Sequence, residues 1–339
     1  MYDIITFGSA TRDLFIKSKD FKIVKSQDFI TGQGLGFNLG SKVPIDDLFF
    51  ATGGGGTNTA ATFAKQGFKV AYVGRVGDDT GGRAIIEELK NLGIGSFIGT
   101  DKKLKTAYSI VLSTGKERTI LTYKGACHNL EKKDVPFGKL RARLSNKSWF
   151  YIAGLSGKSA SEILPIIGFA KKNRIKIALN PSGSQLALGL NGLKNILSAV
   201  DVLLLNQEEG ARLAGLPFNK EKEIFKKLSA QGRPVSGGDK IVVMTKGPKG
   251  VVVSDGKNIY SAGVFKEKRY IDRTGAGDAF GSGFVSGLIR NGIEEGIKLG
   301  TANGTAVVEE LGAKNGLLTK NRYQNEARWK NLKISKEKL

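Results

Sequence analysis

Short apolar runs alternate with helix-like segments along most of the chain. The runs at 149–155, 201–206 and 240–247 are almost continuously hydrophobic, which is typical of strands buried on both faces of a parallel sheet. The segments at 57–66 and 279–289 have the apolar spacing of helices. This alternation predicts an α/β fold with a mostly parallel central sheet flanked by helices.

Two polar stretches depart from this pattern. Residues 15–50 are rich in glycine and lack helical spacing, and residues 104–123 contain two β-rich runs around a glycine-containing turn. We expect these stretches to form a small β-sheet lid within a single domain that spans residues 1–319. A basic tail follows at 320–339, where seven Lys or Arg stand against two Glu, and we expect this tail to fray.

Composition limits the class of protein. A chain of 339 residues with 40% hydrophobic content can build a large core. The single cysteine, Cys127, excludes an intrachain disulfide and fits a reducing, cytoplasmic location. The sequence has no apolar run of about 20 residues, so we expect no membrane-spanning helix. The first residues lack the pattern of a signal peptide. The net charge of +22 attracts phosphates, although a solvated basic surface explains it better than binding of nucleic acid does.

The stretch IDRTGAGDAFGSGF, at 271–284, places a glycine-rich turn before an apolar helix. Backbone N–H groups in such a turn can point at an anion, and the start of a helix adds partial positive charge. Asp278 would lie at the helix start and stay ionised at neutral pH, so it could accept the proton of an attacking hydroxyl during phosphoryl transfer. Chemistry alone supports a simple helix cap equally well.

This stretch resembles the C-terminal signature of the ribokinase-like (PfkB) carbohydrate kinases, Asp-Thr-x-Gly-Ala-Gly-Asp-x-Phe, with Arg273 in place of the usual Thr. The stretch GGGGTNTAATFAKQGFKVAYVGRVGDDTGG, at 53–82, resembles the N-terminal motif of the same family, and the two motifs stand in the family's order. The resemblance implies a ribokinase-like fold and ATP-dependent phosphorylation of a sugar hydroxyl, as in ribokinase or fructokinase.

The resemblance also implies roles for single residues. The last Asp of the signature is the family's catalytic base, which gives that role to Asp278. The backbone amides that resemble the family's anion hole belong to Gly275, Ala276 and Gly277.

The acceptor sugar would be held by residues that match the family's sugar-binding positions, namely Asp13, Gly54, Gly55 and Asn58. Gly55 stands where ribokinase itself has a Lys, which weakens the case for ribose. Lys124, in TYKGA, replaces an Arg of some members. It would contact an acidic sugar, or it is a surface lysine at the end of a hairpin.

On the nucleotide side, Asn206 and Glu209 match the family's Asn-x-x-Glu motif, which organises Mg²⁺ and phosphate, with Glu209 acting on Mg²⁺ through water. The same spacing is that of a capping box, and both roles can hold together. The residues that match the nucleotide loop and the adenine-covering helix are Thr245, Gly247, Gly250 and Asn303. Many members also bind a monovalent cation such as K⁺, and the corresponding carbonyl region here would involve Asp272, Thr274 and the loop around Gly312.

Other readings of the sequence stay open. Within the enzymes, the alternatives are a nucleoside kinase of the adenosine type and a 2-keto-3-deoxy sugar acid kinase. From another class, the rival is a basic nucleic-acid-binding protein that has kept the fold without the activity, and the intact Asp278 site argues against it. We expect no membrane partner. The lids of this family often mediate dimers, so a homodimer through the lid is a candidate assembly.

Overall fold

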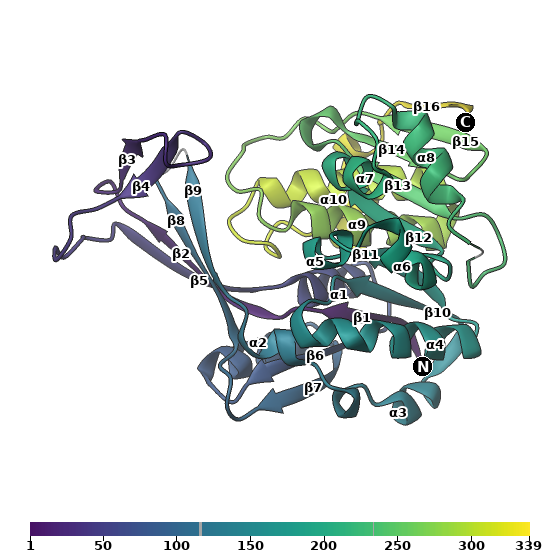
Figure 1. Ribbon diagram of the computed structural model, residues 1–339, viewed down its shortest axis with the longest axis horizontal. Helices are drawn as coiled ribbons and strands as arrows, with labels where there is room; N and C mark the ends of the chain where they lie inside the picture. Colours follow the sequence, from purple (N-terminus) through teal and green to yellow (C-terminus); the bar gives the residue numbers. More distant parts are fainter. Residues whose placement is uncertain (115–116, 233) are drawn as a thin grey trace.

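The computed structural model describes residues 1–114, 117–232 and 234–339. A long mixed sheet lies at the centre of this part of the chain (Figure 1). In spatial order its strands are β16 (Ile334–Lys338), β15 (Asn258–Ala262), β14 (Val251–Ser254), β13 (Ile241–Thr245), β12 (Val202–Asn206), β11 (Lys176–Asn180), β10 (Leu144–Ala153), β1 (Tyr2–Gly8), β6 (Val70–Gly77) and β7 (Gly95–Asp101). The strands from β13 to β7 are parallel, and the three at the other edge pair antiparallel.

Helices cover both faces of the sheet, because successive side chains of a buried strand point to opposite faces. Ile4 and Ile5 of β1, for example, belong to two different hydrophobic clusters. One cluster is closed by α1 (Gly55–Lys65), α2 (Thr80–Asn91), α9 (Ala276–Asn291) and α10 (Ile293–Val308). The other is closed by α3 (Phe137–Arg141), α4 (Ile163–Lys172), α5 (Gly183–Leu186), α6 (Gly189–Leu197), α7 (Gln207–Ala214) and α8 (Glu221–Ser229). The layered α/β fold predicted from the alternation is confirmed.

A smaller sheet projects from this body as an arm, at the left of Figure 1. Its strands lie in the order β5 (Asp47–Gly53), β2 (Thr11–Lys17), β8 (Ala107–Ser113) and β9 (Arg118–Tyr123), and β3 (Lys22–Lys25) and β4 (Gln33–Gly36) form a hairpin at its far end. We call these strands the lid. The lid expected from 15–50 and 104–123 is therefore present, although β2 starts earlier, because only two residues separate it from β1.

The last twenty residues are folded, which corrects the expectation that they fray. They form α11 (Lys320–Asn325), the short helix η5 (Ala327–Trp329) and β16, which extends the sheet beside β15. The side chain of Trp329 is 1% exposed and packs edge-on against the ring of Phe265 at 5.3 Å. The many basic residues of this segment led to the prediction of a tail, but a few apolar side chains among them are buried. Their burial holds the segment against the domain. In the described residues no helix is long and apolar enough to cross a membrane.

We predict that Trp329→Ala destabilises the whole domain. Removing a buried indole from a packed cluster typically costs about 3–5 kcal/mol of unfolding free energy. Urea unfolding followed by circular dichroism measures the change. Lys338→Ala, an exposed position on β16, is the matched control and should leave the midpoint almost unchanged. A Trp329→Ala midpoint equal to that of the native chain would show that the C-terminal segment does not contribute to the fold.

Candidate active site

The predicted site residues gather where the lid meets the carboxyl ends of the parallel strands. Between β10 and β1 the strand order reverses direction, and open α/β sheets bind ligands in the crevice at such a point. Asp13 comes from lid strand β2, Asn58 from α1 and Asp278 from α9. Three elements that are distant in sequence thus supply the polar side chains of one region.

Asp278 lies in the first turn of α9 and is half-buried. The side-chain amide of Asn58 donates a hydrogen bond to its Oδ2 at 2.9 Å. A side chain added at Gly55 would begin only 3.4 Å from Asp278 Oδ1, so the carboxylate lies against the start of α1. The fold therefore brings the N-terminal and C-terminal motifs into direct contact.

Burial raises the pKa of the Asp278 carboxyl, while the hydrogen bond from Asn58 and the positive charge of Lys314 act in the opposite direction. Desolvation thus outweighs the stabilisation of the ionised form that we expected from the helix start. A carboxylate with a raised pKa is a stronger proton acceptor than one in water.

The glycine turn in front of Asp278 has a backbone that favours glycine. Gly275 has φ 77°, and a side chain there would overlap Ala313. The N–H of Ala276 bonds to the carbonyl of Arg273 at 3.2 Å, so this amide is used within the turn. Gly277 lies in the first turn of α9, where N–H groups have no partner within the helix, and it lines a cavity. Of the three predicted anion-hole residues, Gly277 is thus the one that faces open space.

Asp13 is buried in the lid sheet at 4% exposure. Thr11 Oγ1 donates to its Oδ1 at 2.9 Å, and its Oδ2 lies against the backbone of Gly53, beside Gly54 at the cap of α1. Burial raises the pKa of this carboxyl.

Asn58 carries an unsatisfied polar atom beside these residues. Its Oδ1 is buried and has no hydrogen-bond partner among the described residues. Buried polar atoms are almost always paired, so an orphan of this kind points to a ligand group. A hydroxyl of a bound molecule is the simplest donor for a carbonyl oxygen.

A cavity of about 140 Å³ is lined by three of the residues predicted for nucleotide and Mg²⁺ and by one glycine of the anion-hole turn. It lies at the ends of β12 and β13 and reaches the start of α9. Its walls include Asn206, Glu209, Thr245 and Gly277. The chain therefore places the Asn-x-x-Glu motif, the start of the nucleotide loop and the anion-hole turn around one space.

Asn206 and Glu209 form the capping box that their spacing predicted. Asn206 Oδ1 accepts from the Glu209 N–H at 2.8 Å, and Glu209 Oε2 accepts from the Asn206 N–H at 2.8 Å. Burial raises the pKa of Glu209. Because each carboxylate has a second oxygen, the cap leaves Glu209 able to act on the cavity that it lines.

The predicted nucleotide loop forms a tight turn between β13 and β14. Thr245 ends β13, and the short helix η4 (Gly247–Lys249) follows. Gly250 has φ 94°, and a side chain there would overlap the carbonyl of Ala262.

Asn303 does not lie where the sequence predicted. Its side chain on α10 is fully buried, and its amide donates to the Ala279 carbonyl at 2.8 Å while its Oδ1 accepts from the Leu318 N–H at 2.9 Å. These bonds hold α10 to α9 and to the segment before α11. The prediction that Asn303 covers adenine is therefore wrong, because its polar atoms are used inside the fold.

Asp272 and Thr274 have a partner that the sequence did not predict. Asp272 Oδ1 accepts from the hydroxyl of Thr274 at 2.9 Å and pairs with the guanidinium of Arg118 on lid strand β9. Arg118 also donates to Thr274 Oγ1 at 2.8 Å. The guanidinium of Arg118 thus neutralises the Asp272 carboxylate. The monovalent-cation site that involves the carbonyl region of this segment stays a prediction.

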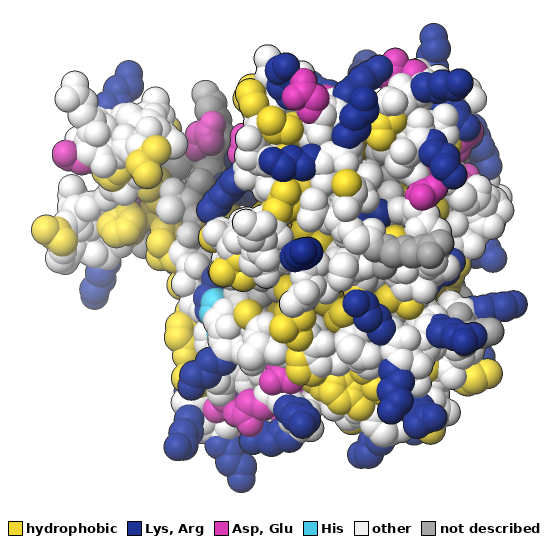
Figure 2. Space-filling view, turned by 45° about the vertical axis from the view of Figure 1, so that its right-hand side comes forward, with side chains coloured by type: hydrophobic (Ala, Val, Ile, Leu, Met, Phe, Trp, Pro, Cys, Tyr) yellow, Lys and Arg dark blue, Asp and Glu magenta, His cyan; other side chains and the backbone are white. Residues whose placement is uncertain are grey.

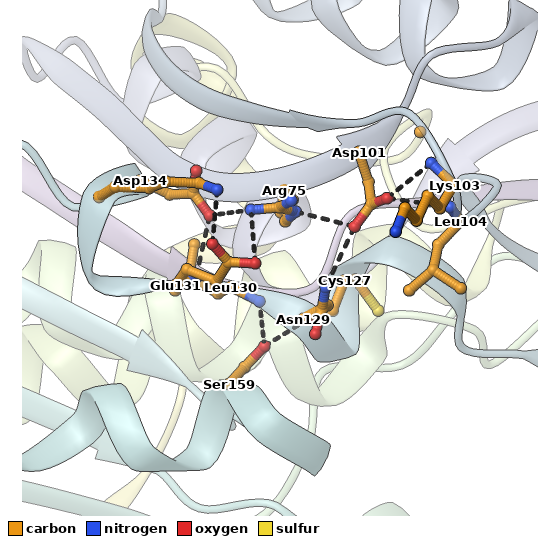
Figure 3. Close-up of polar contacts among 12 residues, drawn as sticks. Arg75, Asp101, Lys103, Leu104, Cys127, Asn129, Leu130, Glu131, Asp134 and Ser159 are labelled. Carbon is orange, nitrogen blue, oxygen red and sulfur yellow. Dashed lines mark hydrogen bonds and ion pairs between the residues drawn. The ribbon is translucent and has the colours of Figure 1, made fainter.

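Lys124 is exposed just after β9, where the lid joins the body, and it directly precedes the short helix η1 (Gly125–Asn129) without capping it through its side chain. An ion network fixes the segment that follows (Figure 3). Arg75 donates to Asp101 at 3.2 Å and to Asp134 at 2.6 Å, and Asn129 donates to Asp101 at 3.1 Å. The pKa of Asp101 is held well below its usual range. The backbone N–H groups of Leu104 and Lys103 contribute most to this, and Asn129 and Arg75 contribute less.

This network gives the base of the lid a rigid support. Arg75, Arg118 and Lys314 were missed by the sequence analysis, since each meets partners from distant segments. None stands in a local pattern that distinguishes it from the many other basic residues.

Basic side chains are spread over the face of the body that is in view (Figure 2). Figure 2 shows Lys and Arg side chains scattered across the visible face of the body, while hydrophobic side chains stand out on the lid. Exposed apolar side chains of the lid and of its connecting loops include Ile23, Ile30, Leu39, Leu48, Phe50 and Ile120.

Comparison with known proteins agrees with this geometry. The model of the pfkB family carbohydrate kinases matches residues 4–320. A ribokinase of Haemophilus influenzae is 29% identical over 236 residues, covering 69% of this chain and 72% of that protein. An adenosine kinase of Saccharomyces cerevisiae is 26% identical over 241 residues, covering 68% and 69%.

Solved structures share the fold over nearly the whole chain. Ribokinase from Giardia lamblia has a TM-score of 0.76 at 21% identity and covers 96% of this chain and 98% of its own. Arabidopsis thaliana ribokinase, solved with ribose and ATP, has a TM-score of 0.75 at 19% identity and covers 97% and 99%. The chain therefore belongs to the pfkB family of carbohydrate kinases and is an ATP-dependent phosphotransferase, of the ribokinase and adenosine kinase type, that acts on hydroxyl groups of sugars or nucleosides.

Proposed function

We propose that this enzyme transfers the γ-phosphoryl group of ATP to a sugar hydroxyl, with Asp278 as the general base. The observation that carries the proposal is the half-buried Asp278 carboxylate, held by Asn58 beside the glycine turn. Asp278 takes the proton of the acceptor hydroxyl, the hydroxyl oxygen forms a bond to the γ-phosphorus, and the bond from that phosphorus to the ADP oxygen breaks.

The other site residues bind the acceptor, the transferred phosphoryl group and the nucleotide. Asp13 and Asn58 hold hydroxyl groups of the acceptor, and Lys124, Gly54 and Gly55 border it. The N–H of Gly277, with Gly275 and Ala276 shaping the turn, stabilises charge on the transferred group. Thr245, Gly247 and Gly250 hold the nucleotide.

Mg²⁺ would bind at Glu209 and Asn206 and would neutralise charge on the phosphates when present. The cavity that these residues share with Gly277 suits an anionic ligand with a hard cation. A monovalent cation held by carbonyl groups of the segment around Asp272 and Thr274 would add positive charge near the glycine turn.

Two acceptor classes besides simple sugars have specific support. Adenosine kinases stand among the relatives, which favours a nucleoside as the second candidate. Lys124 at the base of the lid would suit a sugar acid. Binding of nucleic acid has less support, because basic side chains are spread over the surface in view (Figure 2). The exposed apolar side chains of the lid support a homodimer through that sheet, and the single cysteine supports a cytoplasmic location.

A coupled assay of ADP release with ribose, fructose, adenosine and a 2-keto-3-deoxy sugar acid tests the proposal. We expect Asp278→Asn to lower kcat on the preferred acceptor by about 10²–10⁴-fold, because the amide keeps the size of the carboxylate but cannot take the proton. Affinity for a nonhydrolysable ATP analogue, measured by calorimetry, should persist. Near-normal kcat in Asp278→Asn would show that another group is the base.

A second prediction separates acceptor from nucleotide. Asp13→Asn removes the buried charge that we assign to the acceptor, so KM for the acceptor should rise by about tenfold or more. KM for ATP should change little, since the predicted nucleotide residues lie on other elements. Steady-state kinetics with each substrate varied in turn gives both values. A similar rise in the two KM values would contradict the assignment of Asp13 to the acceptor.

A third prediction separates the two roles of Glu209. Glu209→Gln can still accept the Asn206 N–H bond, so the melting temperature should stay nearly constant. Loss of the negative charge should raise the Mg²⁺ concentration that is needed for the half-maximal rate by roughly several-fold. Asn180 lines the same cavity and carries no charge. Asn180→Ala is therefore the control for a change in the shape of the cavity. A lower melting temperature with normal Mg²⁺ dependence would show that Glu209 acts only as part of the helix cap.

A further inference from the structure

Lys314 carries a buried charge that the sequence analysis did not single out. It lies in the loop between α10 and α11, and its side chain is 7% exposed. Its Nζ contacts Glu88 Oε2 of α2 at 2.6 Å and Thr52 Oγ1 of β5 at 2.8 Å. Thr52 and Glu88 also contact each other. A buried ammonium with two such partners is held in one place.

The backbone of the same loop is held from a third element. Lys65 Nζ on α1 donates to the carbonyl of Lys314 at 3.0 Å. The preceding residue, Ala313, fills the space in which a side chain of Gly275 would stand. The loop therefore connects α1, α2 and β5 with the turn that precedes Asp278.

We propose that Lys314 is a positioning residue for phosphoryl transfer, which fixes Ala313 against the anion-hole turn and whose buried positive charge acts on both Asp13 and Asp278. This inference rests on the proposed function, in which Asp278 is the base and Asp13 binds the acceptor. It adds a residue that touches neither substrate and acts through the two carboxylates that do.

The charges around Lys314 support this role. Its ammonium lowers the pKa of both the Asp278 and the Asp13 carboxyls, against the burial that raises them. Arg12 on β2 also lowers the pKa of Asp13, and Tyr151 on β10 interacts electrostatically with Asp278. Lys65 on α1 and Glu88 on α2 act on Lys314 itself, whose pKa is lowered by burial and raised by Glu88. Glu88 is the acid in this set that pairs with Lys314, so it weakens the positive field that reaches the site.

Two substitutions should therefore move the activity in opposite directions along the pH axis. Lys314→Met keeps most of the aliphatic stem and removes the charge, so the Asp278 pKa rises and the acid limb of the kcat/KM profile moves to higher pH. We expect kcat/KM to fall about tenfold on the acid limb of the profile and less on its plateau. Glu88→Gln keeps a hydrogen-bonding group but removes the negative charge, so the acid limb should move to lower pH.

The matched control is Lys240→Met. Lys240 is another buried lysine, 2% exposed, and its Nζ donates to the carbonyls of Leu197 at 2.7 Å and Gln231 at 2.6 Å, away from the predicted site residues. Loss of this ammonium should lower the melting temperature without moving the acid limb. It therefore measures what the loss of a buried lysine does to the fold alone.

The proposal is tested by measuring kcat/KM across the pH range, on the intact chain with its preferred acceptor. Opposite shifts in Lys314→Met and Glu88→Gln support the proposal. An equal loss at every pH in Lys314→Met, or a shift in the same direction for both variants, overturns it. If Lys314→Met does not fold, the downward shift in Glu88→Gln still supports the proposal, and an unmoved limb in that variant overturns it.

Failure of this inference differs from failure of the proposed function. If Asp278→Asn is inactive while the acid limb stays unmoved in the Lys314 and Glu88 variants, Asp278 stands as the base and only the role of Lys314 is lost. If Asp278→Asn stays active, the base itself is misassigned, whatever the two variants do.

Discussion

The contact between Asp278 and Asn58 is the interaction on which the rest of the site depends. It joins the first turn of α9 to α1 at 2.9 Å, across 220 positions of sequence. A carboxylate that is moved out of water needs donors or positive charge in its surroundings. Asn58 supplies a donor and Lys314 supplies a charge, so the two halves of the site are incomplete without each other.

The layered fold explains why these groups meet. Parallel strands end at one edge of the sheet, and the helices that follow them begin there. The lid adds Asp13 at the same edge, because β2 follows β1 after a two-residue connection. The network of Arg75, Asp101 and Asp134 fixes the other junction of lid and body (Figure 3). Thus both ends of the lid are tied to the sheet that carries the site.

Much of this arrangement could be predicted from local patterns. The apolar strands, the glycine stops and the capping box at Asn206 and Glu209 depend on contacts between residues close in sequence. Predictions failed where a residue's partners were distant. Asn303 looked like a nucleotide contact by its position on α10, but Ala279 and Leu318 use its amide. The C-terminal segment looked like a basic tail, but Trp329 anchors it.

By itself, the sequence determined the main alternation of strands and helices before residue 320, the glycine turns and the identity of the polar residues at the strand ends. Hydrophobic spacing and steric limits on the backbone act over a few residues, so they can be read along the chain. The tertiary structure alone decided that Arg118 pairs with Asp272 and that Lys314 joins Glu88 and Thr52. Coulomb attraction and desolvation depend on distances in space, and only the folded chain sets those distances.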